Sequence, residues 1–303
     1  MPRKGRPVSG ILLLDKPAGE TSNRALQRVR RLLQARKAGH TGSLDPLATG
    51  LLPLCFGEAT KVSGCLLDAS KRYEVTARFG VTTDTADAEG ETLERRPVPA
   101  LDRPGVEAAL AGLRGEQDQV PPMYSAVKHQ GRRLYELARS GVEVPRAARR
   151  ITVHALELAW LAGEEAGLRV HCSKGTYVRT LVADLGEALG CGAHVTALRR
   201  TALGPFEAPG MVTLETLEQR AADGPAALDE LLLPPDTAIA DWPAVVLGPE
   251  TAPYLRQGQA VWIPRAPAPG AVRLYGPEGF LGMGLVLDDG RVAPRRLLAV
   301  PEG

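Results

Sequence analysis

The sequence predicts a mixed α/β protein with a small β-domain at the C-terminal end. Residues 72–79 alternate polar and apolar side chains, as a half-buried strand does. Residues 22–37 and 176–189 carry apolar residues at helical spacing. Beyond Pro234-Pro235 short apolar runs are broken by Gly and Pro, which favours β-structure after a linker. The 303 residues suffice for about two domains, which we expect at 1–240 and 241–303.

The remaining elements follow in chain order. Residues 11–14 form an apolar run that predicts a short buried strand. Thr21-Ser22 can cap a helix that we expect to run to about Lys37, with Gly39 as its stop. Residues 39–50 are a loop punctuated by glycines, and residues 51–56 predict another buried strand. Further along we expect a helix over 105–114, an exposed insertion over 128–150, and strands over 168–172 and 194–203.

Composition and charge are those of an ordinary folded protein. Hydrophobic residues make up 44% of the chain and charged residues 24%, which excludes disorder as its overall state. The net charge is only +2, so any basic surface for nucleic acid must be local. Aromatic residues make up 4%, too few for a protein that stacks many bases on aromatic platforms.

The cysteines and the N-terminus indicate a reducing compartment. Cys55, Cys65, Cys172 and Cys191 form no C-x-x-C pair, so a zinc site has no support from spacing. A chain of this length does not need disulfides to fold. The first apolar run is too short for a signal peptide, and no stretch reaches transmembrane length. We therefore expect a cytoplasmic protein with no membrane contact.

Several common catalytic motifs are absent from the sequence. There is no phosphate-binding loop of the nucleotide-hydrolase type, and a dinucleotide fingerprint that begins at Gly190 fails at Val195. The acidic run over 84–91 lacks the alternating carboxylates of a calcium-binding loop. We expect neither a metal nor a redox cofactor.

The loop over 39–50 carries the strongest chemical signal, with the sequence GHTGSLDPLATG. Its glycines allow sharp turns or a close approach of the backbone to a ligand. Asp45 is its one carboxylate, and Pro46 biases it toward an extended conformation. Taken alone, an Asp-Pro pair is more often a plain turn, and His40 a hydrogen-bonded loop histidine.

This segment resembles the catalytic loop of the TruB-type tRNA pseudouridine synthases. Other motifs of that family occur in the same order between about residues 9 and 205. They are LDKPAG (14–19) with Thr21-Ser22, GEATK (57–61), KRY (71–73), TDTAD (83–87), PPMYSA (121–126), SKGTYVRT (173–180), DLG (184–186) and CGAH (191–194). The resemblance implies the pseudouridine-synthase fold, with a mixed, mostly antiparallel sheet.

The resemblance also implies a reaction, the isomerisation of uridine 55 in the T-loop of tRNA to pseudouridine. The glycosidic C–N bond breaks, the base rotates, and a C–C bond forms at C5. This chemistry consumes no electrons, metal or nucleotide. It requires a carboxylate, which is Asp45, either as nucleophile or as base and electrostatic partner. Nucleophilic addition and glycal formation both stay open.

Further site residues follow from the same resemblance. Arg179 is the partner that would lower the pKa of Asp45 by roughly 1–3 units against the cost of burial. Tyr73 would stack on the target base and could take the proton from C5. Tyr177 and Leu198 correspond to residues that line the uridine pocket. From the local sequence alone, Arg179 would be a surface cation and the other three core residues.

A uridine inside a folded T-loop must be flipped out, which costs a few kcal/mol. His40 corresponds to a family histidine that inserts where the base was. Lys16 lies in a family motif at a strand end and would support the catalytic loop, although no exact role is assigned to it.

Two regions are expected to contact RNA away from the reacting base. The insertion over 121–150 would close over the tRNA arm through its cations, which are Lys128, Arg132, Arg133, Arg139, Arg146, Arg149 and Arg150. If about five contact phosphates, log affinity falls with log salt at a slope near −4. The tail from about Pro243 resembles a PUA-type RNA-binding domain, around Gly279–Gly282 and Pro294-Arg295-Arg296. Without that resemblance it is a generic small β-barrel.

Two other functions compete with a stand-alone enzyme. The related catalytic subunit of guide-RNA particles shares the Leu-Asp-Pro core of the loop. The residues GHTG at 39–42 and the insertion argue against it, so we expect no obligate protein partner. The second is a tRNA-folding chaperone for which binding matters more than chemistry. The two activities can coexist, and the sequence does not separate them.

Overall fold

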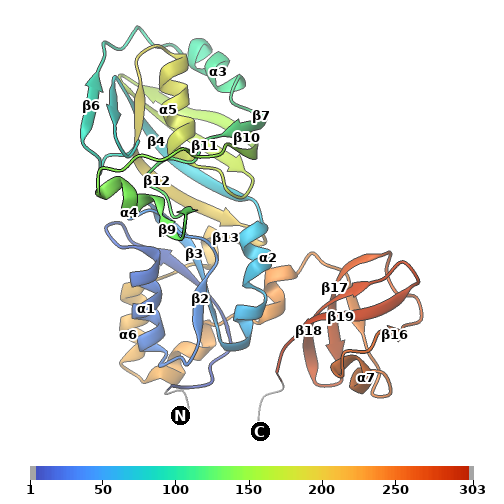
Figure 1. Cartoon of the computed structure of the whole chain (residues 1–303). Helices are drawn as coiled ribbons and strands as arrows, with labels where there is room; N and C mark the ends of the chain where they lie inside the picture. The colour runs from blue at the N-terminus through green and yellow to red at the C-terminus, as the bar shows by residue number, and fades with distance from the viewer. Residues whose placement is uncertain (1–4, 300–303) are drawn as a thin grey trace.

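The computed structural model describes residues 5–299. A large domain is built on a ten-stranded sheet, and a smaller domain on a five-stranded sheet follows it at the C-terminal end (Figure 1). Within the described residues no helix is both long and apolar enough to cross a membrane.

The large sheet is mixed and mostly antiparallel, as predicted. Its order is β14 (Val212–Thr213), β1 (Gly10–Lys16), β3 (Thr49–Phe56), β12 (Ala193–Leu203), β4 (Lys71–Phe79), β11 (Glu165–Cys172), β10 (Arg149–Ala162) and β7 (Gly115–Gln119). Only the pairs β1–β14 and β3–β12 are parallel. Two short strands extend the sheet, β2 (Ala38–His40) on β3 and β13 (Phe206–Glu207) on β12.

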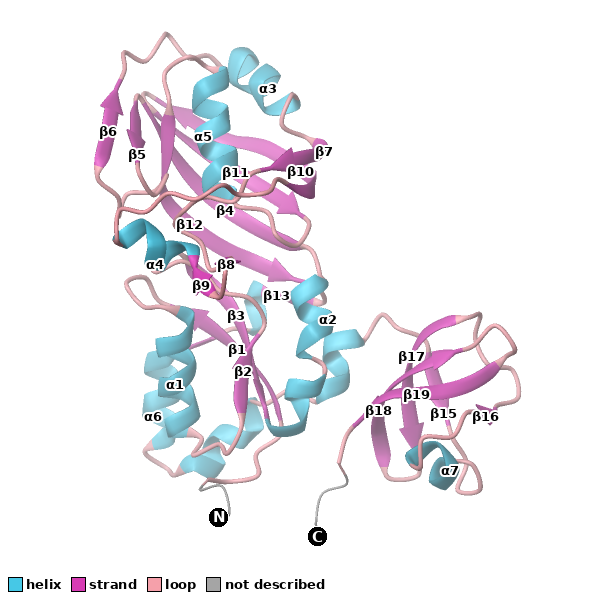
Figure 2. Ribbon diagram, viewed as in Figure 1, coloured by secondary structure: helices cyan, strands magenta, loops and turns pink. Residues whose placement is uncertain are grey.

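The helices cover the two halves of this sheet differently. The strands β1 and β3 are packed on both faces. On one face, Leu12 and Leu52 share a hydrophobic cluster with helix α1 (Ser22–Leu32). On the other, Ile11 and Leu51 share a second cluster with α2 (Ser63–Asp68). The half made of β4, β11 and β10 is covered on one face by α3 (Arg103–Ala111) and α5 (Val178–Ala188) (Figure 2). Because side chains alternate along each strand, the other face carries the residues between the buried ones, such as exposed Arg72, Glu74 and Arg78 of β4.

The smaller elements complete the large domain. They are η1 (Gly57–Lys61), the hairpin β5 (Val81–Thr83) and β6 (Thr92–Arg95), the hairpin β8 (Lys128–His129) and β9 (Arg132–Arg133), α4 (Leu134–Arg139), η2 (Ala208–Gly210), α6 (Leu214–Ala221), η3 (Pro225–Leu231) and η4 (Pro235–Ile239). The expected insertion thus contains a hairpin and a helix rather than only loop.

The first predicted helix is shorter than expected. It ends at Leu32, and Gln34 takes a left-handed φ of 52° that turns the chain back. Gly39 is not a helix stop, because it lies in β2 and pairs with Cys55 of β3. The cause is tertiary: the segment after α1 adds a strand to the sheet, which outweighs its helical pattern.

The longest strand, β10, was missed by the sequence analysis. Its register against β11 shifts between Val153 and Ala155 and again between Leu158 and Trp160. Each bulge reverses the order of inward and outward side chains, so the strand does not show one continuous alternation.

The C-terminal sheet has the order β15 (Ala244–Val246), β17 (Gly270–Gly276), β18 (Gly279–Val286), β19 (Arg291–Leu297) and β16 (Val261–Trp262), with α7 (Ala252–Arg256) beside it. The predicted β-structure of the tail is confirmed. Met283 and Phe280 join the cluster around α2, and Lys61 donates to the carbonyl of Leu297. The domain boundary at residue 240 stays a prediction.

Two helical glycines give a test of this packing. A Cβ on Gly186 in α5 would lie 2.2 Å from the amide nitrogen of Ala193, whereas one on Gly64 in α2 would meet nothing within 4 Å. We predict that Gly186→Ala lowers the free energy of unfolding by about 1–3 kcal/mol, from steric overlap. Gly64→Ala should raise it by about 0.5–1 kcal/mol through helix propensity. Urea denaturation measures the free energy of unfolding of both variants. Equal changes in Gly186→Ala and Gly64→Ala would contradict the packing described.

Candidate active site

The centre of the site is an ion pair between the catalytic-loop carboxylate and a buried arginine. Asp45 lies between β2 and β3, and its Oδ2 is 2.9 Å from Nε of Arg179 in the first turn of α5. Arg179 is 4% exposed, while Asp45 is 40% exposed. A second carboxylate, Asp87, lies 3.6 Å from Nη1 of Arg179 and is 5% exposed. The structure thus brings together the two residues that the resemblance pairs.

Arg179 also fixes two further segments. Its Nη1 donates to the carbonyl of Thr85, and its Nη2 donates to the carbonyl of Tyr124 at 2.8 Å. One guanidinium therefore joins the catalytic loop, the loop that carries Asp87 and the start of the insertion. Sequence reasoning missed Asp87 and this use of Tyr124, although both lie in the quoted motifs TDTAD and PPMYSA.

The backbone on either side of Asp45 is held by the connection between β1 and α1. The Ser22 hydroxyl accepts from the amide of Leu44 at 2.7 Å and donates to its carbonyl at 3.0 Å. Fully buried Lys16 donates to the carbonyl of Pro46 at 3.3 Å and to that of Glu20 at 2.7 Å. Lys16 therefore lies where it supports the loop.

Burial raises the pKa of Asp45 above its ordinary value, and the nearby charge of Asp87 adds to this. Arg179 and Lys16 act in the opposite direction. Arg179 thus lowers this pKa against the cost of burial, as expected, but burial is the larger effect and the net shift is upward. The same burial lowers the pKa of Lys16 to about 8.

Tyr73 and Leu198 lie on neighbouring strands and face the same side of the sheet. Tyr73 on β4 is directly opposite Arg200 on β12, and Leu198 is opposite Val75. Burial raises the pKa of Tyr73, and the positive charge of Arg200 acts in the opposite direction. This face is the one that packs against α5.

Tyr177 precedes α5 as its N-cap residue and has no side-chain cap. Buried Gln119 on β7 supplies the missing contacts to its backbone. The Gln119 side chain accepts from the amide of Tyr177 at 2.8 Å and donates to its carbonyl at 3.1 Å. Since Arg179 follows two residues later, this clamp also fixes the arginine.

His40 ends β2, close to the start of the catalytic loop. Its Nδ1 is buried and has no hydrogen-bond partner in the described part of the chain. Burial lowers the pKa of His40, and the charges of Arg200 and Arg133 lower it further. The imidazole is therefore neutral near pH 7, and the interpretation as a hydrogen-bonded loop histidine does not hold for Nδ1.

The cations of the insertion fall into two groups. Arg146 pairs with Glu143, and Arg150 with Glu116. The other five are exposed and form no ion pair within residues 5–299: Lys128, Arg132, Arg133, Arg139 and Arg149. Arg133 and Arg139 lie 5.9 and 5.6 Å from the ring centre of Tyr135.

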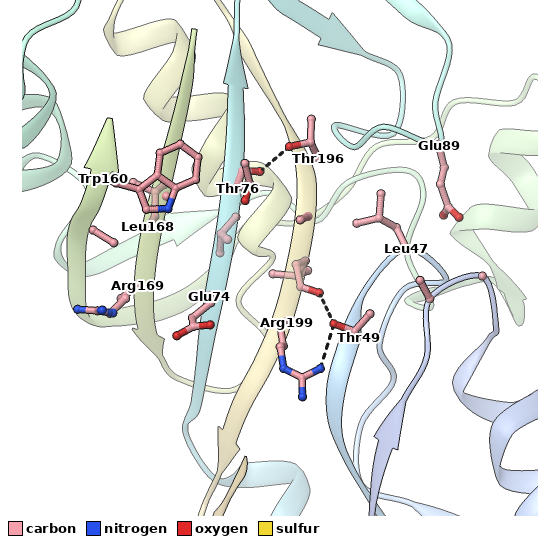
Figure 3. A pocket seen from close by; sticks show the side chains of 17 residues that line it. Leu47, Thr49, Glu74, Thr76, Glu89, Trp160, Leu168, Arg169, Thr196 and Arg199 are labelled. Atoms are coloured by element: carbon pink, nitrogen blue, oxygen red, sulfur yellow. Dashed lines mark hydrogen bonds between the residues drawn. The ribbon is translucent and has the colours of Figure 1, made fainter. Parts of the chain in front are cut away.

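A pocket of about 770 Å³ lies on the large sheet (Figure 3). Glu74, Val75 and Thr76 of β4 line it, as does Leu198 of β12. Leu47 from the catalytic loop lies at its edge. Neither Asp45 nor Arg179 lines this pocket. In residues 5–299 no group of three or more metal-ligating side chains is clustered.

Three family models match consecutive parts of the chain. The TruB family pseudouridylate synthase N-terminal domain matches residues 30–178, the tRNA pseudouridylate synthase B C-terminal domain matches 179–240, and the C-terminal domain of pseudouridine synthase II TruB matches 243–298.

Curated relatives match over nearly the whole length. The tRNA pseudouridine synthase B of Nitrosococcus oceani is 58% identical over 301 residues, which cover 99% of this chain and 98% of the relative. That of Ectopseudomonas mendocina is 60% identical over 295 residues, or 97% and 96% of the two chains.

Solved structures share the fold at lower identity. A chain of the archaeal box H/ACA sRNP Nop10–Cbf5 complex matches with a TM-score of 0.71 and 22% identity, covering 99% of this chain and 92% of the other. A chain of a Cbf5–Nop10–Gar1 complex matches with a TM-score of 0.73 and 24% identity, covering 100% and 90%. From its matched models and full-length relatives, the chain belongs to the TruB family of pseudouridylate synthases.

Proposed function

We propose that this protein isomerises uridine 55 in the T-loop of tRNA to pseudouridine, with Asp45 as the catalytic carboxylate. The observation that carries the proposal is the contact of Asp45 with buried Arg179, in a loop that resembles the family's catalytic loop. Its relatives at 58–60% identity bear the name tRNA pseudouridine synthase B. The protein is accordingly an isomerase.

The geometry suits a carboxylate that acts at the ribose or the base. Arg179 contacts Oδ2, and within the described residues no hydrogen bond reaches Oδ1, which leaves that oxygen for the substrate. The 40% exposure of Asp45 supports the same assignment. Both nucleophilic addition and glycal formation begin from an ionised Asp45, so the Arg179 charge serves either route.

The base would lie among Tyr73, Tyr177 and Leu198. Tyr73 stacks on the uracil, and its phenolate oxygen takes the proton that leaves C5. His40 fills the space in the T-loop that the extruded base vacates. A neutral imidazole suits this role, because a charged ring would cost more to insert among stacked bases.

The RNA would be held by the insertion and the C-terminal domain. The five unpaired cations of the insertion contact phosphates, and the five-stranded sheet serves as a PUA-like RNA-binding domain. We propose that the enzyme is cytoplasmic and works without an obligate protein partner. The structures from guide-RNA particles share its fold at only 22–24% identity, whereas its close relatives are bacterial synthases. A tRNA-folding role can accompany the same binding.

The catalytic assignment predicts a separation of turnover from binding. Asp45→Asn keeps the shape of the side chain and removes its charge, so pseudouridine formation should fall at least about 10⁴-fold while tRNA affinity is retained. Asp184→Asn, an exposed position on α5, is the matched control and should leave both unchanged. Single-turnover pseudouridine assays and filter binding measure the two quantities. Retained turnover in Asp45→Asn would exclude the assignment.

The pH dependence follows from the groups around Asp45. Activity requires the carboxylate, so it is lost as pH falls through a pKa above the ordinary 3.8. Arg179→Gln removes an opposing positive charge and should move the acid limb of kcat/KM to higher pH. Asp87→Asn removes a like charge and should move it to lower pH. If the acid limbs of kcat/KM in Arg179→Gln and Asp87→Asn shift in the same direction, this electrostatic explanation is wrong.

The insertion predicts a definite salt dependence. With five phosphate contacts, the slope of log Kd for tRNA against log salt should have a magnitude of about 4. Arg132→Gln should reduce that magnitude by about 1. Arg150→Gln is the control, since Arg150 is already paired with Glu116 and should change it little. A flat salt response in the unmodified protein would contradict the role of the insertion.

A further inference from the structure

Arg200 is a buried cation without a carboxylate partner. It lies in β12, is 1% exposed, and is among the largest fully buried side chains. Within residues 5–299 it forms no ion pair, unlike its neighbour Arg199, which pairs with Asp15 at 2.7 Å. Burying a charge without a counter-charge costs several kcal/mol, so a purely structural role would be served better by an apolar side chain.

The contacts of Arg200 lead to the site. Its Nε donates to the carbonyl of Leu51 at 2.6 Å, and its Nη2 donates to the carbonyl of Gly42 at 3.3 Å. Gly42 lies three residues before Asp45 in the catalytic loop. Tyr73 is its directly opposed cross-strand neighbour on the same face of the sheet, where paired side chains lie close together. Both hydrogen-bond partners of Arg200 are carbonyls, so within the described residues no counter-charge neutralises it beside Tyr73.

Two buried cations lie near Tyr73: Arg200 on the opposite strand, and Lys71 two residues earlier on β4, whose Nζ donates to the carbonyls of Leu67 and Ala69. The groups that act on its phenol are Arg200 from β12, the thiol of Cys172 from β11 and Asp45 from the catalytic loop. Of these, only Arg200 favours the phenolate, while burial and the other two disfavour it. Tyr73 can accept a proton only as its phenolate, which the positive charge of Arg200 stabilises.

We propose that Arg200 is a positioning residue for the isomerisation, which stabilises the Tyr73 phenolate as proton acceptor and holds the Asp45 loop through Gly42. The proposal rests on the function proposed above. After the C–C bond to C5 has formed, the C5–H bond breaks and its proton joins the Tyr73 oxygen. The electron pair forms the C5–C6 double bond, the electrons of the C6–N1 double bond move to N1, and N1 takes a proton from water. Tyr73 then returns its proton to solvent, so the step balances.

The test separates the effect of the Arg200 charge from the effect of its side-chain volume. Arg200→Met removes the charge and keeps much of the volume, and Arg200→Gln also keeps a donor for one carbonyl. Arg200→Lys retains the charge. Arg199→Met is the matched control, one residue along the same strand on the opposite face. Proteins labelled with ¹³C at tyrosine Cζ report the titration of Tyr73 by NMR, with its signal assigned through Tyr73→Phe.

We expect the two neutral variants to raise the pKa of Tyr73 and to slow single turnover by about 10- to 100-fold. The Kd for tRNA should stay within about twofold, since Arg200 is fully buried. Arg200→Lys should keep the Tyr73 pKa and the turnover rate close to those of the wild type, and Arg199→Met should change neither of them. If Arg200→Met does not fold, which circular dichroism shows, Arg200→Gln and Arg200→Lys make the same comparison.

Two results would overturn the inference. One is an unchanged Tyr73 titration in every folded neutral variant. The other is an equal loss of turnover in the Lys and neutral variants, which would indicate a structural role only. Because the titration needs no substrate, it is independent of the proposed function. If the wild-type protein forms no pseudouridine in tRNA, the proposed function is contradicted. If the wild-type protein is active and Arg200→Met and Arg200→Gln show the same Tyr73 titration and the same turnover, only this inference is contradicted.

Discussion

The ion pair between Arg179 and Asp45 is the constraint on which the rest of the site depends. A buried guanidinium must be satisfied on every side, and Arg179 meets this with Asp45, Asp87 and the carbonyls of Thr85 and Tyr124. Because those partners come from separate segments, the charge requirement of one side chain fixes the relative positions of three loops. The site is therefore assembled by electrostatics on a scaffold that hydrophobic packing supplies.

The sheet explains how the loops reach one another. The strands β3 and β12 pair in parallel only at Thr49–Gly50 and Arg199–Arg200, directly after the catalytic loop that leads into β3. Lys16 and Ser22 fix this loop from one side, and Gln119 fixes the start of α5 from the other. Each of these polar groups is buried and hydrogen-bonded, which makes the site rigid before RNA arrives.

Much of this could be predicted from the sequence, for physical reasons that differ between elements. The strand over 71–79 and the helix over 178–188 showed clear periodicity because one face of each is buried. The strand over 149–162 did not, because two bulges interrupt its alternation. Asp45 and Arg179 were predicted through a family resemblance, since local pattern alone gave a turn and a surface cation. The roles of Asp87 and Arg200 emerged only from long-range contacts, and the net rise in the pKa of Asp45 needed the burial that only the fold provides.

The most direct measurement of the central claim is pseudouridine mapping of a defined, unmodified tRNA transcript after incubation with the purified protein and no added cofactor. The account predicts one modified position, the T-loop uridine numbered 55, and complete conversion at that position with excess enzyme. A transcript that is bound but contains no pseudouridine, or one modified outside the T-loop, would contradict it.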